Sequence, residues 1–187
     1  MTTSNDFRNG MALNLDGKLV TIVDFQHVKP GKGGAFVRSK LKDVVTGAVV
    51  EKTWRGGEKV EEVRLERTPM QFLYREDDMF HVMHQVTFDQ ITLPADLFGE
   101  QAQFLKENET VNVLMHGDKP VTAEIPNFVE LEVTSTEPGF RGNTAQGATK
   151  PATMETGAVV QVPLFIEQGE ILRIDTRTKA YMERVKR

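Results

Sequence analysis

Hydrophobic and polar residues alternate along much of this chain, and that period is typical of half-buried β-strands. In residues 35–42 the odd positions are small or apolar, and the even positions are Phe36, Arg38, Lys40 and Lys42. In residues 19–25 the odd-numbered side chains are predicted to face one way, and the even-numbered ones, including Val20 and Ile22, the other way. The pattern therefore predicts two strands, the second with a cationic face.

The same alternation recurs along the rest of the chain and indicates an all-β protein. Further strands are predicted at residues 72–74, 80–84, 111–115, 121–125, 128–134, 158–164 and 171–176. Turn signals such as HGDKP and EQGE separate them. One short helix is expected at about 94–107, with its apolar residues on one side. Many short strands joined by turns are typical of small barrels.

The length of the chain allows three small domains. We place their boundaries near residues 65 and 128, because the charge balance changes at the first and the residues IPN interrupt the strand pattern at the second. The expected domains are residues 1–65, 66–128 and 129–187, and barrels of about 60 residues can fold alone. Together they are expected to form an elongated monomer.

Composition narrows the classes of protein that fit. Hydrophobic residues make up 39% and charged residues 27% of the chain, as in ordinary globular proteins. No apolar run is long enough to cross a bilayer, and no secretory signal is visible, so we expect a cytoplasmic protein without membrane contact. With no cysteine, the chain has no disulfides, thiolate metal sites or cysteine nucleophile.

The net charge of −4 is unevenly distributed. Residues 1–65 carry a net +3, residues 66–128 a net −7, and residues 129–187 are balanced. Within the first third, the window 28–42 holds five Lys and Arg residues and no acid, which suits contact with phosphates. Arg38, Lys40 and Lys42 are therefore candidates for RNA binding, although a solvated strand face would look the same.

The sharpest local motif is HVKPGKGGAF, residues 27–36. Pro30 followed by Gly31 predicts a type II turn with a positive φ at Gly31, which would leave Lys32 at the tip. Gly33 and Gly34 remove side-chain bulk, so this backbone can approach a crowded surface. A protruding lysine beside Lys29 suits an anionic target, but a plain surface hairpin has the same local sequence.

Two long segments resemble bacterial elongation factor P. DFQHVKPGKGGAFVRSKLKDVVTGAVVEKTWRGGEKVEE is similar to the family's first domain, and GNTAQGATKPATMETGAVVQVPLFIEQGEILRIDT resembles its third. The resemblance implies an SH3-like (KOW-like) barrel followed by two OB-fold barrels, together shaped like tRNA. It also implies a non-enzymatic factor that binds the 70S ribosome and ribosomal RNA beside peptidyl-site tRNA and relieves stalling at consecutive prolines.

The resemblance also assigns expected roles to particular residues. Lys32 matches the lysine that family members modify, so a lysine-modifying enzyme is a further expected partner, and Lys29 and Arg38 would contact phosphates. Where the family has Gly-Asp-Thr near the exit-site codon, this chain has Gly142, Asn143 and Thr144, and Asn143 lacks the carboxylate charge. Tyr181 and Arg184 match positions associated with tRNA contact, although a strand residue and a surface arginine also explain them.

Other classes of protein fit the sequence less well. The chain has no G-x-S-x-G, HExxH or strand-linked GxGxxG motif, so neither an enzyme nor a bound cofactor is expected. His81 and His84 are three residues apart in a predicted strand and would face opposite sides, so no metal site is expected. The alternatives that stay open are a divergent paralogue of elongation factor P and a generic OB-fold RNA-binding protein.

Overall fold

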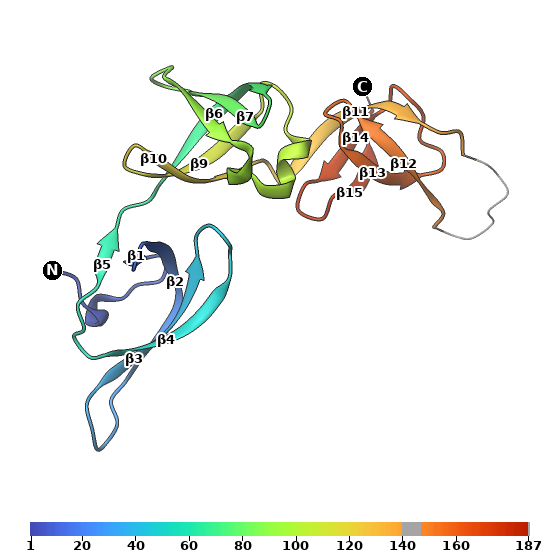
Figure 1. Cartoon of the computed structure of the whole chain (residues 1–187). Helices are drawn as coiled ribbons and strands as arrows, with labels where there is room; N and C mark the ends of the chain where they lie inside the picture. The colour runs from blue at the N-terminus through green and yellow to red at the C-terminus, as the bar shows by residue number, and fades with distance from the viewer. Residues whose placement is uncertain (140–146, 187) are drawn as a thin grey trace. The chain divides into compact units, whose positions relative to one another are not determined.

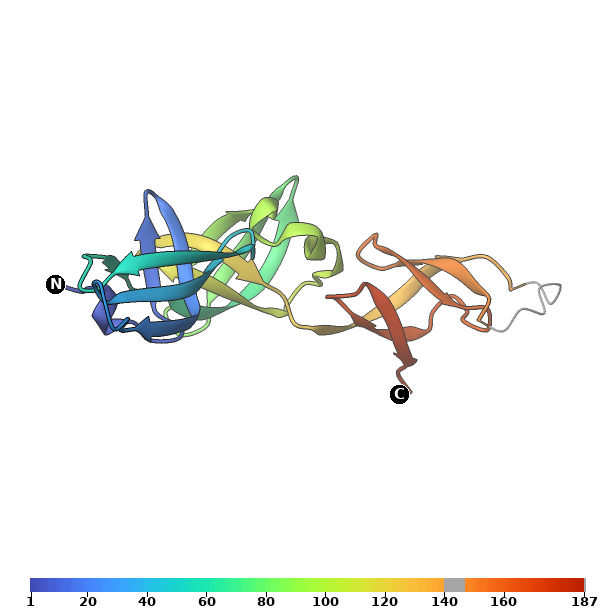
Figure 2. The same cartoon turned by 90° about the horizontal axis from the view of Figure 1, so that it is seen from below.

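The protein consists of three antiparallel sheets of five strands each, with few helical residues (Figures 1 and 2). The computed structural model describes residues 1–139 and 147–186. By contact density, Met1–Thr68 with Val113–Thr122 forms one compact unit, and Pro69–Asn112 with Ala123–Arg187 forms another. None of the helices in the described ranges is long and apolar enough to cross a membrane.

The first sheet has the strand order β4-β3-β2-β1-β5 and is preceded by a 3-10 helix, η1. Its elements are η1 (Ser4–Asp6), β1 (Ala12–Leu15), β2 (Lys18–Val28), β3 (Phe36–Asp43), β4 (Val49–Arg55) and β5 (Glu61–Val63). The alternation predicted for β3 is confirmed, because Val37, Ser39 and Leu41 are buried and the three basic side chains between and after them are exposed. The apolar residues of this sheet pack with Phe7, Met11 and Trp54 into one core.

The strand predicted at residues 19–25 exists, but its faces differ from the prediction. Val20 and Ile22 are buried, as one face of a regular strand requires. Ile22 pairs with Leu41 and Asp24 with Lys40, so Val23 is an extra residue that β3 does not match. This β-bulge reverses the alternation, and Phe25 then packs against the core on the same side as Ile22.

The second sheet has the order β10-β9-β6-β7-β8. Its strands are β6 (Glu66–Glu76), β7 (Met79–His84), β8 (Gln90–Pro94), β9 (Thr110–His116) and β10 (Lys119–Glu124). Aromatic rings fill part of its core, with the ring centroid of Phe80 5.2 Å from that of Phe72 and 4.9 Å from that of Phe98. The strands predicted at residues 80–84, 111–115 and 121–125 are all present.

The single helix expected at residues 94–107 is instead two short 3-10 helices, η2 (Ala95–Leu97) and η3 (Gly99–Phe104). Gly99 has a φ of +62°, a left-handed conformation that ends one helical turn and prevents a continuous α-helix. Of the residues predicted for the apolar side, Phe98 and Leu105 are buried, but Phe104, which was not predicted for that side, is buried most completely. The spacing identified part of the buried face but not the type of helix.

The third sheet has the order β13-β12-β11-β14-β15. Its strands are β11 (Phe128–Thr136), β12 (Thr149–Met154), β13 (Val159–Pro163), β14 (Ile171–Asp175) and β15 (Ala180–Arg184). Strand β12 was not predicted, because Pro151 lies within it and lacks the N–H that a ladder normally uses. The fully buried Thr176 donates its hydroxyl to the Pro126 carbonyl at 2.7 Å, which ties the entry of β11 to the end of β14.

Candidate functional site

Lys32 lies at the centre of the loop that joins β2 to β3. Residues 29–35 are all exposed, and the last strand pair before the loop is Val28 with Phe36. Figure 1 shows this loop extending beyond the sheet of the first domain. Two long paired strands therefore carry a seven-residue loop whose lysine is accessible to a partner, in the position that the sequence predicts.

The turn within this loop differs from the prediction. Gly31 does not have a positive φ, whereas Gly33 has a φ of +108°. The left-handed conformation is therefore adopted after Lys32 rather than before it. The Cγ atom of Pro30 lies 3.9 Å from the place where a Gly33 Cβ would be, so Pro30 packs across the loop toward Gly33.

Gly56, at the end of β4, holds the return arm of the tip loop. Its N–H donates to the Ala35 carbonyl at 2.9 Å, and a Cβ atom built on Gly56 would lie 2.9 Å from that same oxygen. Real Cβ atoms essentially never come within 3.0 Å of another heavy atom, so this close approach requires glycine. The sequence patterns did not predict this role, although the Gly-Gly pair after a tryptophan-containing strand was an available signal.

The N-terminal segment around η1 also fixes the turn that contains Gly56. Ser4 is fully buried and donates its hydroxyl to the Arg55 carbonyl at 2.7 Å, while accepting the Glu58 N–H at 3.2 Å. The carboxylate of Asp6 caps η1 by accepting the backbone N–H and the hydroxyl of Thr3, and these bonds hold the pKa of Asp6 below its usual value. The base of the lysine loop is thus built from three separate parts of the chain.

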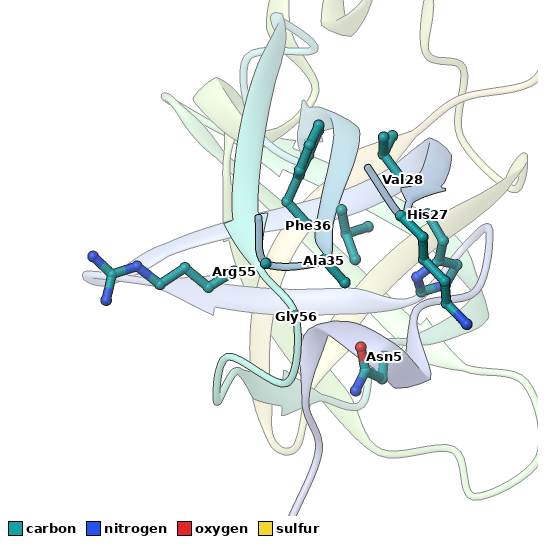
Figure 3. A pocket seen from close by; sticks show the side chains of 10 residues that line it. Asn5, His27, Val28, Ala35, Phe36, Arg55 and Gly56 are labelled. Atoms are coloured by element: carbon teal, nitrogen blue, oxygen red, sulfur yellow. The ribbon is translucent and has the colours of Figure 1, made fainter. Parts of the chain in front are cut away.

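An open hollow of about 980 Å³ lies at the base of this loop (Figure 3). It is lined by Asn5, His27, Val28, Lys29, Gly34, Ala35, Phe36, Val37, Arg55 and Gly56. The lining combines an aromatic ring, basic side chains and exposed backbone. Such a surface can accept part of an RNA chain by stacking and by phosphate contact.

The basic face predicted for β3 is present, but neighbouring strands moderate its charge. Arg38, Lys40 and Lys42 are exposed, and the Arg38 guanidinium lies 5.5 Å from the centroid of the Phe36 ring. Lys40 has Glu51 opposite it on β4 and Asp24 opposite it on β2. The positive potential should therefore be strongest toward Arg38 and the tip rather than uniform along the strand.

Tyr181 and Arg184 are brought to one side of β15 by a bulge. Tyr181 pairs with Ile174 and Arg184 with Leu172, so one extra residue lies between the two pairs. In a regular strand without a bulge, a spacing of three residues would put them on opposite faces. Arg184 already has protein partners, because it lies 2.9 Å from a Glu170 carboxylate oxygen and 4.9 Å from the Phe165 ring centroid.

Glu170 is held as a carboxylate by two kinds of donor. The backbone N–H of Glu167 donates to this carboxylate at 2.8 Å, and the guanidinium of Arg184, at the end of β15, also donates to it. These hydrogen bonds, the first one most strongly, place the pKa of Glu170 below its usual value. An RNA phosphate would have to compete with this carboxylate for Arg184.

The predicted residues Gly142, Asn143 and Thr144 lie outside the described residues. After them in the sequence, the buried Lys150 donates its ammonium to the Glu137 carbonyl at 2.6 Å. Lys150 therefore holds together the two strand ends that flank this segment.

Histidines take part in local packing. The His81 ring stacks on Tyr74 at 4.3 Å between centroids, and His84 accepts hydrogen bonds from the backbone of the loop that follows it. Within residues 1–139 and 147–186, no three His, Asp or Glu side chains gather closely enough to hold a metal ion.

Family models match nearly the whole chain. The model of the elongation factor P KOW-like domain matches residues 3–60, that of the elongation factor P OB domain matches residues 65–123, and that of the elongation factor P C-terminal region matches residues 129–184. The chain belongs to the elongation factor P family. It is therefore related to translation factors rather than to enzymes, and the predicted all-β fold of small barrels is confirmed.

Full-length relatives agree with this assignment. Elongation factor P of Acetivibrio thermocellus is 54% identical over 185 residues, covering 99% of this chain and 100% of the relative. That of Natranaerobius thermophilus is 54% identical over 186 residues, covering 100% of this chain and 99% of the relative. That of Corynebacterium jeikeium is 51% identical, with 99% of each chain covered.

Solved structures of a related factor resemble part of the chain. The eukaryotic translation initiation factor 5A from Methanococcus jannaschii aligns with a TM-score of 0.50 and 25% identity, covering 65% of this chain and 94% of that one. An initiation factor 5A family protein from Naegleria fowleri aligns with a TM-score of 0.53 and 16% identity, covering 67% and 94%. These similarities extend over about two thirds of the present fold.

Proposed function

We propose that this elongation factor binds the 70S ribosome beside peptidyl-site tRNA and speeds peptide-bond formation at consecutive prolines. The observation that carries the proposal is the exposed Lys32 at the centre of a loop whose base is held by hydrogen bonds from the buried Ser4 and from Gly56. Because the base of the loop is already held in place, the Lys32 ammonium can bind against the acceptor end of a tRNA with little loss of conformational entropy.

The mechanism we propose is positional. Proline reacts poorly as an acceptor because its ring fixes φ and its nitrogen is a secondary amine. Holding the peptidyl-tRNA in a reactive orientation lowers the entropic part of the barrier, and orientation alone can contribute about 7–11 kcal/mol in favourable systems. No side chain of this protein needs to transfer a proton or form a covalent bond, so the ribosome remains the catalyst.

RNA contacts follow from the same arrangement. We propose that Lys29 and Arg38 bind phosphates beside the tip, that Lys40 and Lys42 add to the local positive potential, and that ribosomal RNA lies against this face. Pro30, Gly31, Gly33 and Gly34 keep the loop narrow. In the third domain, Tyr181 and Arg184 would contact tRNA.

Further parts of the proposal concern the whole chain. We propose that the working domains are residues 1–65, 66–128 and 129–187, and that the protein acts as a monomer in the cytoplasm. We also propose that the segment with Gly142, Asn143 and Thr144 approaches the exit-site codon. A lysine-modifying enzyme would act on Lys32, since that side chain is accessible from solvent.

The test is reconstituted translation of a message with three consecutive prolines, using protein purified from its own source. We expect full-length product with the wild type and its loss with Lys32→Ala. Lys18→Ala is the matched control, because Lys18 is also exposed in the first domain but lies at the opposite end of β2 from the lysine loop.

Each result of this test bears on a different part of the proposal. Rescue by wild type and by both variants would leave the factor activity intact and remove the special role of Lys32. Failure of the wild type to restore product would refute the proposed function and favour a generic OB-fold RNA-binding protein.

A further inference from the structure

The turn between β13 and β14 fixes the position of Glu170. Its carbonyl accepts the Val133 N–H at 2.9 Å, and the neighbouring Gly169 donates its N–H to the Val133 carbonyl at 2.9 Å, so β11 holds this backbone. The two carboxylate oxygens have separate donors, since Oε2 accepts the Glu167 N–H at 2.8 Å and Oε1 accepts from Nη1 of Arg184 at 2.9 Å. The carboxylate therefore cannot rotate without losing a hydrogen bond.

Arg184 is held through one nitrogen and one face of its guanidinium. Nη1 donates to Glu170, and the guanidinium carbon lies 4.9 Å from the Phe165 ring centroid. The backbone after it is also fixed, because Val185 donates its N–H to the Ile171 carbonyl at 2.8 Å. In the part of the chain that the structure describes, Nε and Nη2 of Arg184 have no acceptor, and 47% of the side chain is exposed. These two nitrogens are free to bind a ligand.

The free nitrogens are the pair that suits a phosphate. The N–H groups on Nε and Nη2 of a guanidinium are parallel, and they match two oxygens of one phosphate or carboxylate. Arg177, between β14 and β15, shows this geometry, because its Nε and Nη2 donate to the two oxygens of Asp175 at 3.1 and 2.9 Å. Arg184 keeps the same pair of donors unused, and a phosphate would meet Glu170 as a competitor only at Nη1.

Arg173 shows that an ion pair beside an aromatic ring does not by itself produce this arrangement. Its Nη1 lies 3.4 Å from Glu183, and its guanidinium carbon lies 4.7 Å from the Phe128 ring centroid. The Glu183 side chain is 62% exposed, however, and among the described residues no backbone N–H donates to its carboxylate. Glu170 differs, because its side chain is 28% exposed and has a backbone donor.

Glu170 can affect phosphate binding at Arg184 in two opposite ways. A free arginine has many rotamers, and ordering it on binding reduces affinity, so a partner that orders it in advance increases affinity. The negative charge of Glu170 also repels a phosphate, but solvent and salt screen this repulsion because the site is partly exposed. The ordering effect is not screened, so it should be the larger of the two.

We propose that Glu170 is a positioning residue for RNA binding, which holds Arg184 so that its Nε and Nη2 bind a backbone phosphate of peptidyl-site tRNA. The proposal rests on the tRNA contact of Arg184 proposed above and adds a residue that does not itself touch RNA. This contact sets the affinity of the factor for the ribosome, and Lys32 sets the rate once the factor is bound.

The first experiment measures the dissociation constant of the labelled full-length factor from 70S ribosomes that carry peptidyl-site tRNA. We expect the constant to rise about three- to tenfold in Glu170→Ala, with an unchanged rate of diprolyl peptide-bond formation at saturation. Glu170→Asp keeps the charge, but its shorter side chain cannot reach both donors, so it should show a similar rise. The matched control is Glu183→Gln, which removes the carboxylate paired with Arg173 in the same sheet and should change the constant little.

The sign of the effect in Glu170→Ala is decisive. An unchanged or lower dissociation constant would mean that Glu170 acts on Arg184 only as a competing charge, and the proposal would be wrong. An unchanged melting temperature of Glu170→Ala shows that weaker binding is not caused by partial unfolding.

The second experiment tests whether Glu170 acts through Arg184. In an Arg184→Ala background, Glu170→Ala should not raise the dissociation constant further, because the side chain that it positions is gone. An equal rise in both backgrounds would assign Glu170 a general structural role instead and overturn the proposal.

Ribosomes without peptidyl-site tRNA identify the ligand. On these ribosomes the wild type and Glu170→Ala should bind equally well. If Glu170→Ala weakens binding there by the same factor, the ligand of Arg184 is ribosomal RNA or a ribosomal protein, and the assignment to tRNA is wrong.

The two proposals fail in different ways. If the wild type neither binds ribosomes nor stimulates the reaction, the proposed function is refuted, and the role of Glu170 is refuted with it. If the wild type is active and Glu170→Ala binds as tightly as the wild type, only the role of Glu170 is refuted.

Discussion

Gly56→Ala should displace the lysine loop from outside, through contact with Ala35, the last residue of the loop. The added Cβ would lie 2.9 Å from the Ala35 carbonyl oxygen and 3.4 Å from the Ala35 carbonyl carbon and Cβ. Backbone atoms cannot rotate away as a side-chain end can, so either the clash persists or the return arm of the loop moves. Gly56 does not have a positive φ, so alanine adds no backbone strain of its own.

The expected size of the effect follows from these contacts. Overpacking of this kind costs about 1–3 kcal/mol, and loss of the hydrogen bond from Gly56 to Ala35 costs about 1 kcal/mol more. In a domain of this size each kcal/mol lowers the melting temperature by about 4–8 °C. A displacement of about 1 Å at a positioning group can reduce a rate about 100-fold, so the activity should fall even at temperatures where the variant remains folded.

The assay is the rate of diprolyl peptide-bond formation at saturating factor, paired with thermal unfolding. Val49→Ala is the control, since Val49 is 55% exposed and lies at the opposite end of β4 from Gly56. We expect Val49→Ala to keep most of the activity and Gly56→Ala to lose most of it. Wild-type activity and melting temperature in Gly56→Ala would refute the view that this contact positions Lys32.

Two further predictions concern stability. Ser39→Ala removes the acceptor of the buried Trp54 indole N–H, a bond of 2.8 Å, and should lower the free energy of unfolding by about 1–3 kcal/mol in urea titrations, whereas the exposed Thr53→Ala should change it little. Because the pKa of Glu170 is lowered in the folded state, its stabilising contribution is complete above its usual value of 4.5 and disappears as the pH falls through the lowered pKa. Glu170→Gln should therefore lose less stability than the wild type between pH 7 and acid conditions, and identical pH profiles of unfolding would contradict this role for Glu170.

Local sequence patterns predicted several features of this protein. The period-two pattern on β3 identified both faces, because each side chain's direction follows from its position in the strand. The sequence correctly placed Lys32 in an exposed loop, because the proline and glycines around it disfavour regular secondary structure. The long resemblance in the first and third domains predicted the family that the comparisons then showed.

Other features depend on pairs of residues far apart in the chain. The bulges at Val23 and beside Tyr181 reverse a face, and only the register with the neighbouring strand reveals the extra residue. Pro30 followed by Gly31 predicted a left-handed φ at Gly31, but the folded loop has it at Gly33.

Gly56 and Lys40 show the physical reason most clearly. Glycine is required at position 56 only because the Ala35 carbonyl lies so close to it in the folded protein. Lys40 lies in a segment of sequence without acids, but in the sheet Asp24 and Glu51 flank it on the two neighbouring strands. Periodicity and turn chemistry are local properties, so the sequence by itself determined many of the strands, the basic face of β3 and the exposed lysine. Steric fit and charge neighbours arise between strands, so only the tertiary structure decided how the lysine loop is held and where its positive field is strongest.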